Sequence, residues 1–199
     1  VIVPRHPQRF DAVAAQVAAR GLALARRSRE DAVTAQTRVW LGDSMGEMFA
    51  YYAAAEVALI GGSWLPFGGQ NLIEACAVGT PAIVGPHTFN FLEVAEQAVQ
   101  CGAAQRAVDV DEALTLARPA RRRRGARTRR CGRVRLRPGA SRRDRAHLAD
   151  DRSKIRRAIT ERYCVVVAGH SAQCASLIDA LLWLSAEQSA RQGSSIALR

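Results

Sequence analysis

Short apolar runs alternate with segments of helical periodicity over the first 117 residues. The runs are rich in Val, Ile, Leu and Ala, as strands buried on both faces of a parallel sheet are. Between the runs, apolar residues recur three and four positions apart, which is the spacing on one face of a helix. We therefore predict an α/β domain over residues 1–117, with helices on both faces of a parallel sheet. The predicted strands cover residues 1–3, 22–25, 38–41, 57–60, 82–84 and 104–108, and the predicted helices cover 10–20, 44–54, 71–78, 91–101 and 109–117.

Residues at the ends of the predicted helices support these boundaries. Ser44 and Glu47 have the spacing of a capping box, which favours a helix start at this point. Asp109 is a suitable N-cap for the last predicted helix. Gly21 and Gly79 stand where a left-handed residue commonly follows the end of a helix.

The segment from Gly61 to Glu74, with the sequence GGSWLPFGGQNLIE, holds the clearest candidate chemistry. It follows a predicted strand, contains two glycine pairs and continues into a predicted helix with a carboxylate in its first turn. Glycine lets the backbone approach a ligand closely, and a helix N-terminus attracts anions. The spacing matches neither common nucleotide-binding motif, so the loop by itself supports a tight turn and a ligand site about equally.

The position of this loop in the predicted fold favours the ligand site. In a parallel sheet with right-handed crossovers, residues 4–8, 42–46, 61–70 and 85–90 all fall at the carboxyl ends of the strands. These four loops hold most of the polar and glycine-rich sequence of the domain. We therefore expect a ligand site at this edge, where open α/β sheets commonly bind nucleotides.

The formal net charge of +11 comes from one region of the chain. Residues 118–157 carry 17 arginines and one lysine against three aspartates, a local net charge of +15, and they contain no aromatic residue. Because this segment has few large apolar groups, we predict that it is disordered. It is either an out-of-frame continuation of a GC-rich gene or a tail for nucleic acid or anionic membranes. Residues 158–199 carry no functional motif, and we expect a strand at 163–167 and a helix at 177–184 there.

The five cysteines include no CxxC pair. We therefore expect no metal site and no disulfide framework, and nothing in the sequence indicates a cofactor. The apolar residues 1–3 have the character of the middle of a strand, which favours a fragment of a longer protein.

Five motifs occur in order over residues 1–117: PRHP at 4–7, GDSMGEM at 42–48, GGS at 61–63, GGQNLIEA at 68–75 and GPHTFNF at 85–91. This succession resembles the C-terminal half of bacterial 3-deoxy-D-manno-octulosonic acid (Kdo) transferases, enzymes of lipopolysaccharide synthesis. The resemblance ends near Arg118. It implies the Rossmann-like C-terminal half of a GT-B glycosyltransferase that binds the donor CMP-Kdo. In the family, Kdo is transferred to a lipid A precursor (lipid IVA) at the cytoplasmic face of the inner membrane.

The resemblance also implies donor-binding residues in three of the loops. Arg5 suits the donor phosphate or carboxylate, because a guanidinium forms paired hydrogen bonds with anions; a plain surface arginine is the alternative. Glu74 can accept both ribose hydroxyls, whereas Glu47 either contacts the ligand or only closes the capping box. His6 and His87 either face the donor or shape their loops. The expected donor contacts are Pro4, Arg5, Met45, Gly46, Glu47, Asn71, Leu72, Ile73 and Glu74.

We expect no catalytic residue in this chain. An inverting transferase needs a general base for the acceptor hydroxyl, and in the resembled family that carboxylate lies in the N-terminal domain, which also supplies the acceptor site and the membrane contact. Pro66 stands eight positions before Glu74, where many retaining GT-B enzymes have a second glutamate, so an inverting reaction fits better. The chain alone is therefore expected to transfer no sugar and to bind no specific nucleic acid.

Two other interpretations remain open at this point. The first is an Arg-rich nucleic-acid-binding protein in which the α/β part is a scaffold. The second is a domain that has kept the fold but binds no ligand.

Overall fold

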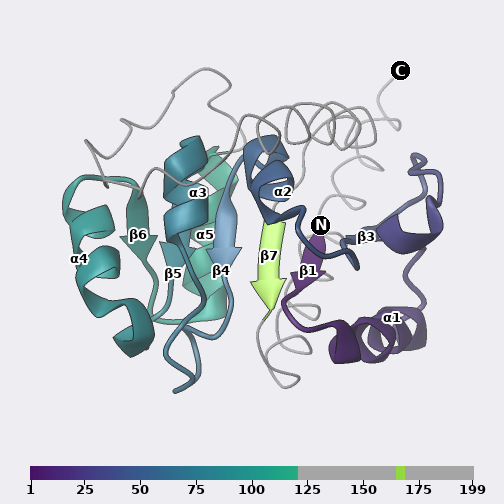
Figure 1. The fold of residues 1–199 in the computed structure, drawn as a ribbon, viewed down its shortest axis with the longest axis horizontal. Helices are drawn as coiled ribbons and strands as arrows, with labels where there is room; N and C mark the ends of the chain where they lie inside the picture. Colours follow the sequence, from purple (N-terminus) through teal and green to yellow (C-terminus); the bar gives the residue numbers. More distant parts are fainter. Residues whose placement is uncertain (121–164, 169–199) are drawn as a thin grey trace, which may run out of the picture.

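The computed structural model describes residues 1–120 and 165–168 and contains a parallel sheet of seven strands (Figure 1). The order of the strands in the sheet is β2-β3-β1-β7-β4-β5-β6. The predicted α/β class with a parallel sheet is confirmed. The strands are β1 (Ile2–Pro4), β2 (Leu24–Arg26), β3 (Val39–Leu41), β4 (Ala58–Ile60), β5 (Ala82–Val84), β6 (Ala104–Arg106) and β7 (Val165–Ala168).

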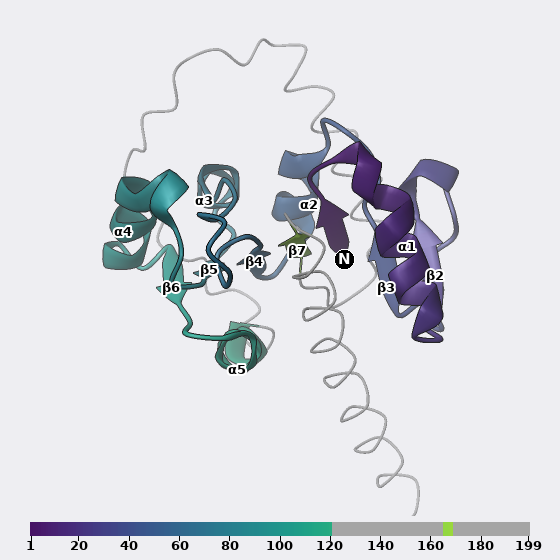
Figure 2. The ribbon, with the colours of Figure 1, turned by 90° about the horizontal axis from the view of Figure 1, so that it is seen from below.

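Helices cover both faces of the sheet, as the sequence predicts. Figure 2 shows α3 and α5 on opposite sides of β4 and β5. The helices are α1 (Phe10–Ala19), α2 (Met48–Ala54), α3 (Ile73–Val78), α4 (Leu92–Gln100) and α5 (Val110–Ala120), with short 3-10 helices at η1 (Pro7–Arg9), η2 (Arg27–Arg29) and η3 (Phe89–Phe91).

The hydrophobic core on the face of α2, α3 and α4 is continuous. Alternate residues of a strand point to opposite faces, and Val3, Ile60 and Val84 all point to this side. Tyr51 and Tyr52 of α2, both fully buried, belong to the same cluster. One core therefore spans both halves of the sheet on this face.

On the opposite face, the described side chains form two clusters. Ile2 and Leu41 pack with Val13 and Val17 of α1. A second cluster joins β4 and β5 to α5 and includes Val57, Leu59, Ile83, Ala113 and Leu114.

The sequence signals at helix ends are confirmed in three places. Gly21 follows α1 with a φ of 67°, and Gly79 ends α3 with a φ of 77°. Before α5, Asp109 Oδ1 accepts a hydrogen bond from Glu112 N at 2.8 Å. These residues stop or start their helices as their chemistry predicts.

Two predicted helix starts are wrong. The helix predicted from residue 44 begins at Met48, and Glu47 at its N-cap makes no side-chain cap bond. The capping box does not form because the Ser44 and Glu47 side chains bond to each other. The helix predicted from residue 71 begins at Ile73, because Asn71 Oδ1 accepts a hydrogen bond from Ile73 N at 2.9 Å and turns the chain just before the helix.

The middle of the sheet contains a strand from the C-terminal part of the chain. β7 pairs in parallel with β1 on one side and β4 on the other. The strand expected at 163–167 is thus present as Val165–Ala168, although its place in the sheet was not predicted. The disorder predicted for the Arg-rich segment beyond Ala120 and the helix expected at 177–184 lie outside the described residues.

The described residues lack several features that would point to other kinds of site. None of their helices is both long and apolar enough to cross a membrane. They contain no group of three or more His, Cys, Asp or Glu side chains that could hold a metal ion. Cys76 is buried and free, whereas Cys101 is disulfide-bonded. Cys131, Cys164 and Cys174 lie outside the described residues, so the expectation that the chain has no disulfide framework stays a prediction.

Candidate functional site

The four loops that the sequence places at one edge of the sheet do lie there. They follow β1, β3, β4 and β5, and every strand pairing is parallel. Strands β1, β2 and β3 lie on one side of β7 and strands β4, β5 and β6 lie on the other, so the chain crosses to the other half of the sheet after β3. The gap between β1 and β4 is therefore the topological switch point, where open α/β sheets bind ligands.

The glycine-rich loop 61–70 is held by contacts within the chain. Gly69 N donates a hydrogen bond to Gly62 O at 2.8 Å. The buried Ser63 hydroxyl donates to Ile60 O at 2.5 Å and accepts from Gly85 N at 2.8 Å. A Cβ atom on Gly85 would lie 2.3 Å from Ser63 O, so the two loops pack too closely for any side chain there. This packing fixes the chain that leads into α3.

The loop after β3 is fixed by a buried ion pair. The Asp43 side chain has no exposed surface and accepts hydrogen bonds from Arg26 Nε at 2.6 Å and from Ser28 N at 2.8 Å. Ser28 Oγ donates a further bond to Asp43 at 2.5 Å. Burial by itself would raise the pKa of Asp43, but the hydrogen bonds from Ser28 and Arg26 outweigh it and lower the pKa. Arg26 also pairs with the exposed Asp11 at 2.8 Å.

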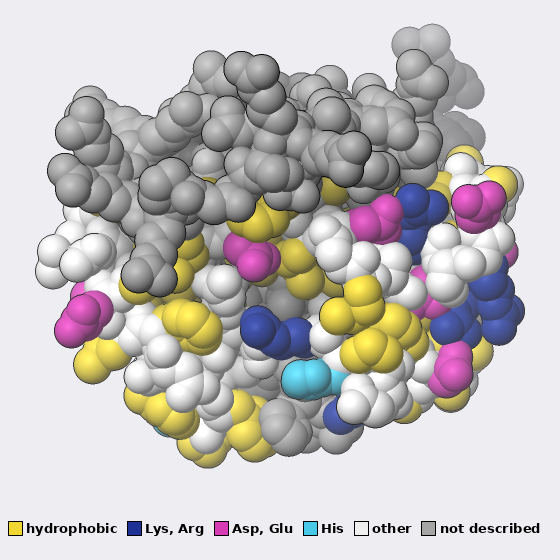
Figure 3. Space-filling model, in the orientation of Figure 1, with side chains coloured by type: hydrophobic (Ala, Val, Ile, Leu, Met, Phe, Trp, Pro, Cys, Tyr) yellow, Lys and Arg dark blue, Asp and Glu magenta, His cyan; other side chains and the backbone are white. Residues whose placement is uncertain are grey.

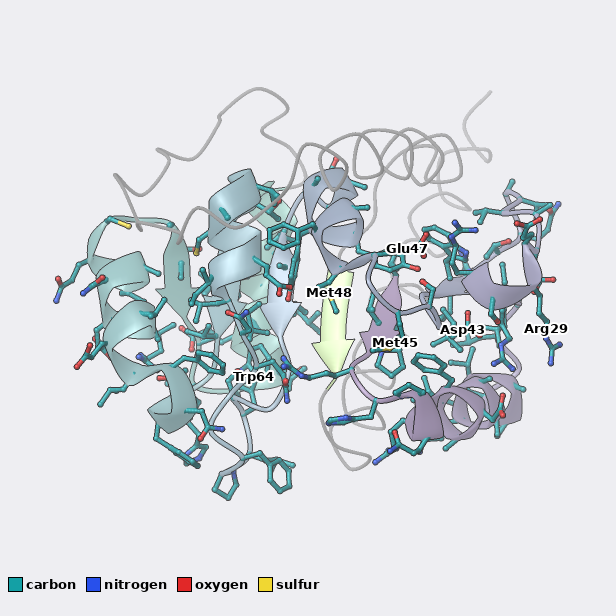
Figure 4. The ribbon with its side chains drawn as sticks, in the orientation of Figure 1. Arg29, Asp43, Met45, Glu47, Met48 and Trp64 are labelled. Atoms are coloured by element: carbon teal, nitrogen blue, oxygen red, sulfur yellow. The ribbon has the colours of Figure 1, made fainter. Side chains whose placement is uncertain are left out.

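Glu47 lies on the same side of the site, just before α2 (Figure 4), and both oxygens of its carboxylate accept hydrogen bonds from neighbouring side chains. One oxygen accepts a hydrogen bond from Arg27 Nη2 at 2.8 Å. The other accepts bonds from Ser44 Oγ and, at 3.3 Å, from Tyr51 OH. Burial would raise the pKa of Glu47, but these hydrogen bonds and the charge of Arg27 lower it. A ligand that contacted this carboxylate would have to displace one of these partners.

Arg5 and Glu74 come from opposite sides of the switch point. Arg5 is exposed directly after β1, and Glu74 is half-buried in the first turn of α3, after β4. Burial raises the pKa of Glu74, while the charge of Arg5 acts in the opposite direction. Among the described residues, Asn71 Nδ2 donates a long hydrogen bond to Glu74, at 3.4 Å. Near the middle of the face seen in Figure 3, acidic, basic and histidine side chains lie close together.

Other predicted site residues reach the site only through their backbone. Pro4 is buried at the end of β1, and Leu72, 1% exposed, belongs to the hydrophobic core. The amide of Ile73 is occupied by Asn71 Oδ1.

Met45 and Gly46 are exposed in the bend before α2. The sequence predicted that their amides belong to the first turn of the helix, but α2 begins only at Met48. His6 is exposed, and His87 is half-buried with its amide bonded to Ser63 O at 2.8 Å.

Sequence reasoning missed the residues that hold the loop after β3. Arg26 ends β2, and Arg27 and Ser28 follow it. These three residues contact Asp43 and Glu47, which follow the neighbouring β3. A run of basic residues after one strand and acidic residues after an adjacent parallel strand was the signal that could have identified them. Neither sequence segment shows the pairing by itself, because the order of the strands must be known first.

No protein-family profile matches the chain, but similar proteins are known. The chain is 58% identical over 128 residues to the 3-deoxy-D-manno-octulosonic acid transferase of Bordetella pertussis, covering 61% of this chain and 30% of that protein. It is 41% identical over 100 residues to the transferase of the same name from Haemophilus influenzae, covering 50% of this chain and 23% of that protein.

A solved structure extends this similarity to the fold. The crystal structure of the C-terminal CMP-Kdo binding domain of WaaA from Acinetobacter baumannii matches with a TM-score of 0.59 and 30% sequence identity. The match covers 77% of this chain and 72% of that domain.

The fold and the site define a doubly wound α/β domain with a polar site at its topological switch point. The chain belongs to the 3-deoxy-D-manno-octulosonic acid (Kdo) transferase family and corresponds to its C-terminal domain. It spans 30% and 23% of the lengths of the two curated relatives described above.

Proposed function

We propose that this chain is the donor-binding part of a Kdo transferase and binds CMP-Kdo at the carboxyl ends of β1 and β4. The observation that carries the proposal is the placement of Arg5 and Glu74 on the two sides of the switch point, after β1 and after β4, where the charge of Arg5 acts on Glu74. The similarity to a CMP-Kdo binding domain supports the identity of the ligand. The GT-B architecture of the full enzyme belongs to the same proposal.

The chemistry of the two side chains suits the two polar parts of CMP. Arg5 is exposed and makes no ion pair with another described residue, so its guanidinium can form paired hydrogen bonds with the phosphate or with the Kdo carboxylate. Glu74 keeps acceptor capacity beyond its long bond from Asn71, which lets it accept hydrogen bonds from the ribose hydroxyls.

Asn71, Ile73 and Leu72 place α3 and Glu74 rather than meeting the ligand through their side chains. Asn71 holds the start of the helix, and Leu72 anchors it in the core. Pro4 has the same role for Arg5, because it ends β1 as a buried residue. Met45, Gly46 and Glu47 form the neighbouring wall, which the ligand meets through exposed backbone.

The rest of the transfer reaction needs groups that we do not assign to the described residues. In this proposal the acceptor is a lipid A precursor, bound by another part of the full enzyme at the cytoplasmic face of the inner membrane. No described residue is nominated as the base, because Arg5 and Glu74 face the donor. The chain alone is expected to bind the donor without transferring it.

Titration of the full chain with CMP, UMP and AMP by calorimetry tests the proposal. We expect CMP to bind most tightly, and Arg5→Ala and Glu74→Ala each to weaken CMP binding by about tenfold or more, as for the loss of a charged hydrogen bond. Glu93→Ala is the matched control, because Glu93 is exposed in the first turn of α4. Arg29→Ala is the control for Arg5. Equal affinities for the three nucleotides, unchanged by Arg5→Ala and Glu74→Ala, would contradict the proposal.

A further inference from the structure

The proposed site lies at the position in the sheet that β7 occupies, and β7 comes from the C-terminal part of the chain. β7 stands between β1 and β4 and pairs with both. Val166 is in register with Ile2 on one side and with Leu59 on the other. Among the described strands, β1 and β4 do not pair with each other. Within the sheet, β7 therefore joins the half formed by β2, β3 and β1 to the half formed by β4, β5 and β6.

The presence of β7 sets the distance between β1 and β4. Neighbouring strands lie about 4.8 Å apart, so one strand between them puts β1 and β4 about 9.6 Å apart. Without β7, the halves would either close to the spacing of direct neighbours or leave the facing N–H and C=O groups of both strands without partners. An unpaired backbone group that is shielded from water is costly.

The two halves carry the two charged groups of the proposed site. Arg5 directly follows β1, and Glu74 lies on α3, which directly follows β4. We infer that β7 is the positioning element of the site: it sets the separation between Arg5 and Glu74. The ligand in this inference rests on the proposed function, whereas the role of β7 in the sheet does not.

The hydrophobic cores show why loss of β7 would loosen the site before it unfolds the domain. On the face of α2 and α3, one continuous core links β1 and β3 to β4 and β5. On the opposite face, the described side chains pack in one cluster under α1 and in another under α5. The helices on the first face would still hold the halves together, but the backbone pairing of β1 and β4 with β7 would be lost. The separation of Arg5 and Glu74 would then vary.

Substitutions at Val166 in the full chain test this role. Val166→Pro removes a backbone donor from a central strand, and Val166→Gly weakens the strand without removing the donor. Val166→Ile keeps the strand-forming character and is the rescue variant. Val134→Pro is the matched control, because it makes the same change in the Arg-rich segment. Hydrogen exchange at residues 2–4 and 58–60 and calorimetric titration with CMP are the two measurements.

We expect Val166→Gly to speed exchange in β1 and β4 while β5 and β6 stay protected, and to weaken CMP binding by about tenfold. Val166→Ile and Val134→Pro should behave like the wild type. Addition of CMP to the wild type should slow exchange at residues 165–168, since a ligand held by both halves stabilises the strand between them.

Two results would overturn the inference: unchanged exchange in β1 and β4 in both Val166→Gly and Val166→Pro, or wild-type CMP affinity in Val166→Gly despite faster exchange. If Val166→Pro unfolds the whole chain, Val166→Gly decides the question. If the wild type binds no CMP, the proposed function fails, and the exchange measurements alone decide whether β7 joins the two halves.

Discussion

Glu47 and Glu74 are both acidic residues of the proposed site, but the chain uses them in opposite ways. Glu47 accepts hydrogen bonds from Arg27, Ser44 and Tyr51, and its pKa is lowered. Within the part of the chain that the structure describes, Glu74 accepts one long hydrogen bond, from Asn71, and burial raises its pKa. The first carboxylate is stabilised in its charged form by the protein, whereas the second is desolvated without full compensation.

This difference separates residues that build the site from residues that bind in it. A carboxylate whose acceptor positions are filled by the chain contributes to folding and has little capacity left for a ligand. A desolvated carboxylate with spare acceptor capacity is destabilising until a partner arrives, and such groups are concentrated at functional sites. We therefore expect substitutions on the side of β3 to change stability, and substitutions on the side of α3 to change binding.

The largest expected effect is on stability and comes from Asp43. Asp43→Ala leaves Arg26 without its buried partner, and we expect the free energy of unfolding to fall by about 3–5 kcal/mol at neutral pH. Asp11→Ala is the matched control, because it removes the exposed partner of the same arginine and should cost less than about 1 kcal/mol. Denaturant unfolding of the three proteins makes the comparison.

The pH dependence of the Asp43 effect has a defined sign. The folded-state pKa of Asp43 is lowered, so its stabilisation is present above its unfolded pKa of about 3.9 and is lost as the pH falls through the folded value. The gap between wild type and Asp43→Ala should therefore narrow below about pH 4. If the difference in the free energy of unfolding between wild type and Asp43→Ala stayed constant from pH 7 to pH 3, the ion pair would not be the source of that difference.

A smaller effect on stability is expected at Glu47. Glu47→Gln keeps hydrogen-bonding atoms but removes the charge that pairs with Arg27, and we expect it to lower the free energy of unfolding by about 1–2 kcal/mol. CMP affinity should stay within about twofold of the wild type. Glu96→Gln is the control, because it changes a half-exposed ion pair with Arg106 that should contribute less than about 1 kcal/mol. A large loss of CMP affinity with unchanged stability would reverse the roles given to Glu47 and Glu74.

The sequence predicted the outer parts of this fold better than its centre. Six strands and five helices follow from short-range apolar patterns, and Asp109 and Gly79 act locally as predicted. The helix start at Met48 was missed because the Glu47 side chain bonds to Ser44 and to Arg27, and Arg27 belongs to another strand connection. The place of β7 was missed for the same reason: strand order depends on pairing between distant segments, which local patterns do not contain.

The prediction of donor contacts has the same limit. The motifs located the right loops, because loop position follows from the alternation of strands and helices. They did not show which side chains in those loops are already bonded within the chain. Burial and hydrogen bonding, which distinguish Glu47 from Glu74, become visible only when the elements are packed together.

The smallest expected effect is an increase in stability at Glu74. Because burial raises the folded-state pKa of Glu74 above its unfolded value, its contribution to stability is present at low pH and is lost as the pH rises through the folded value. Glu74→Gln keeps the shape of the side chain without the charge, so the variant should be slightly more stable than the wild type at pH 7 and equal to it near pH 4. Thermal unfolding without nucleotide between pH 4 and pH 8 measures this difference. Saturating CMP should reverse the order at pH 7, because the wild type gains the ligand's binding energy and the variant gains less. A variant that is less stable than the wild type at pH 7 without nucleotide would mean that Glu74, like Glu47, holds the fold.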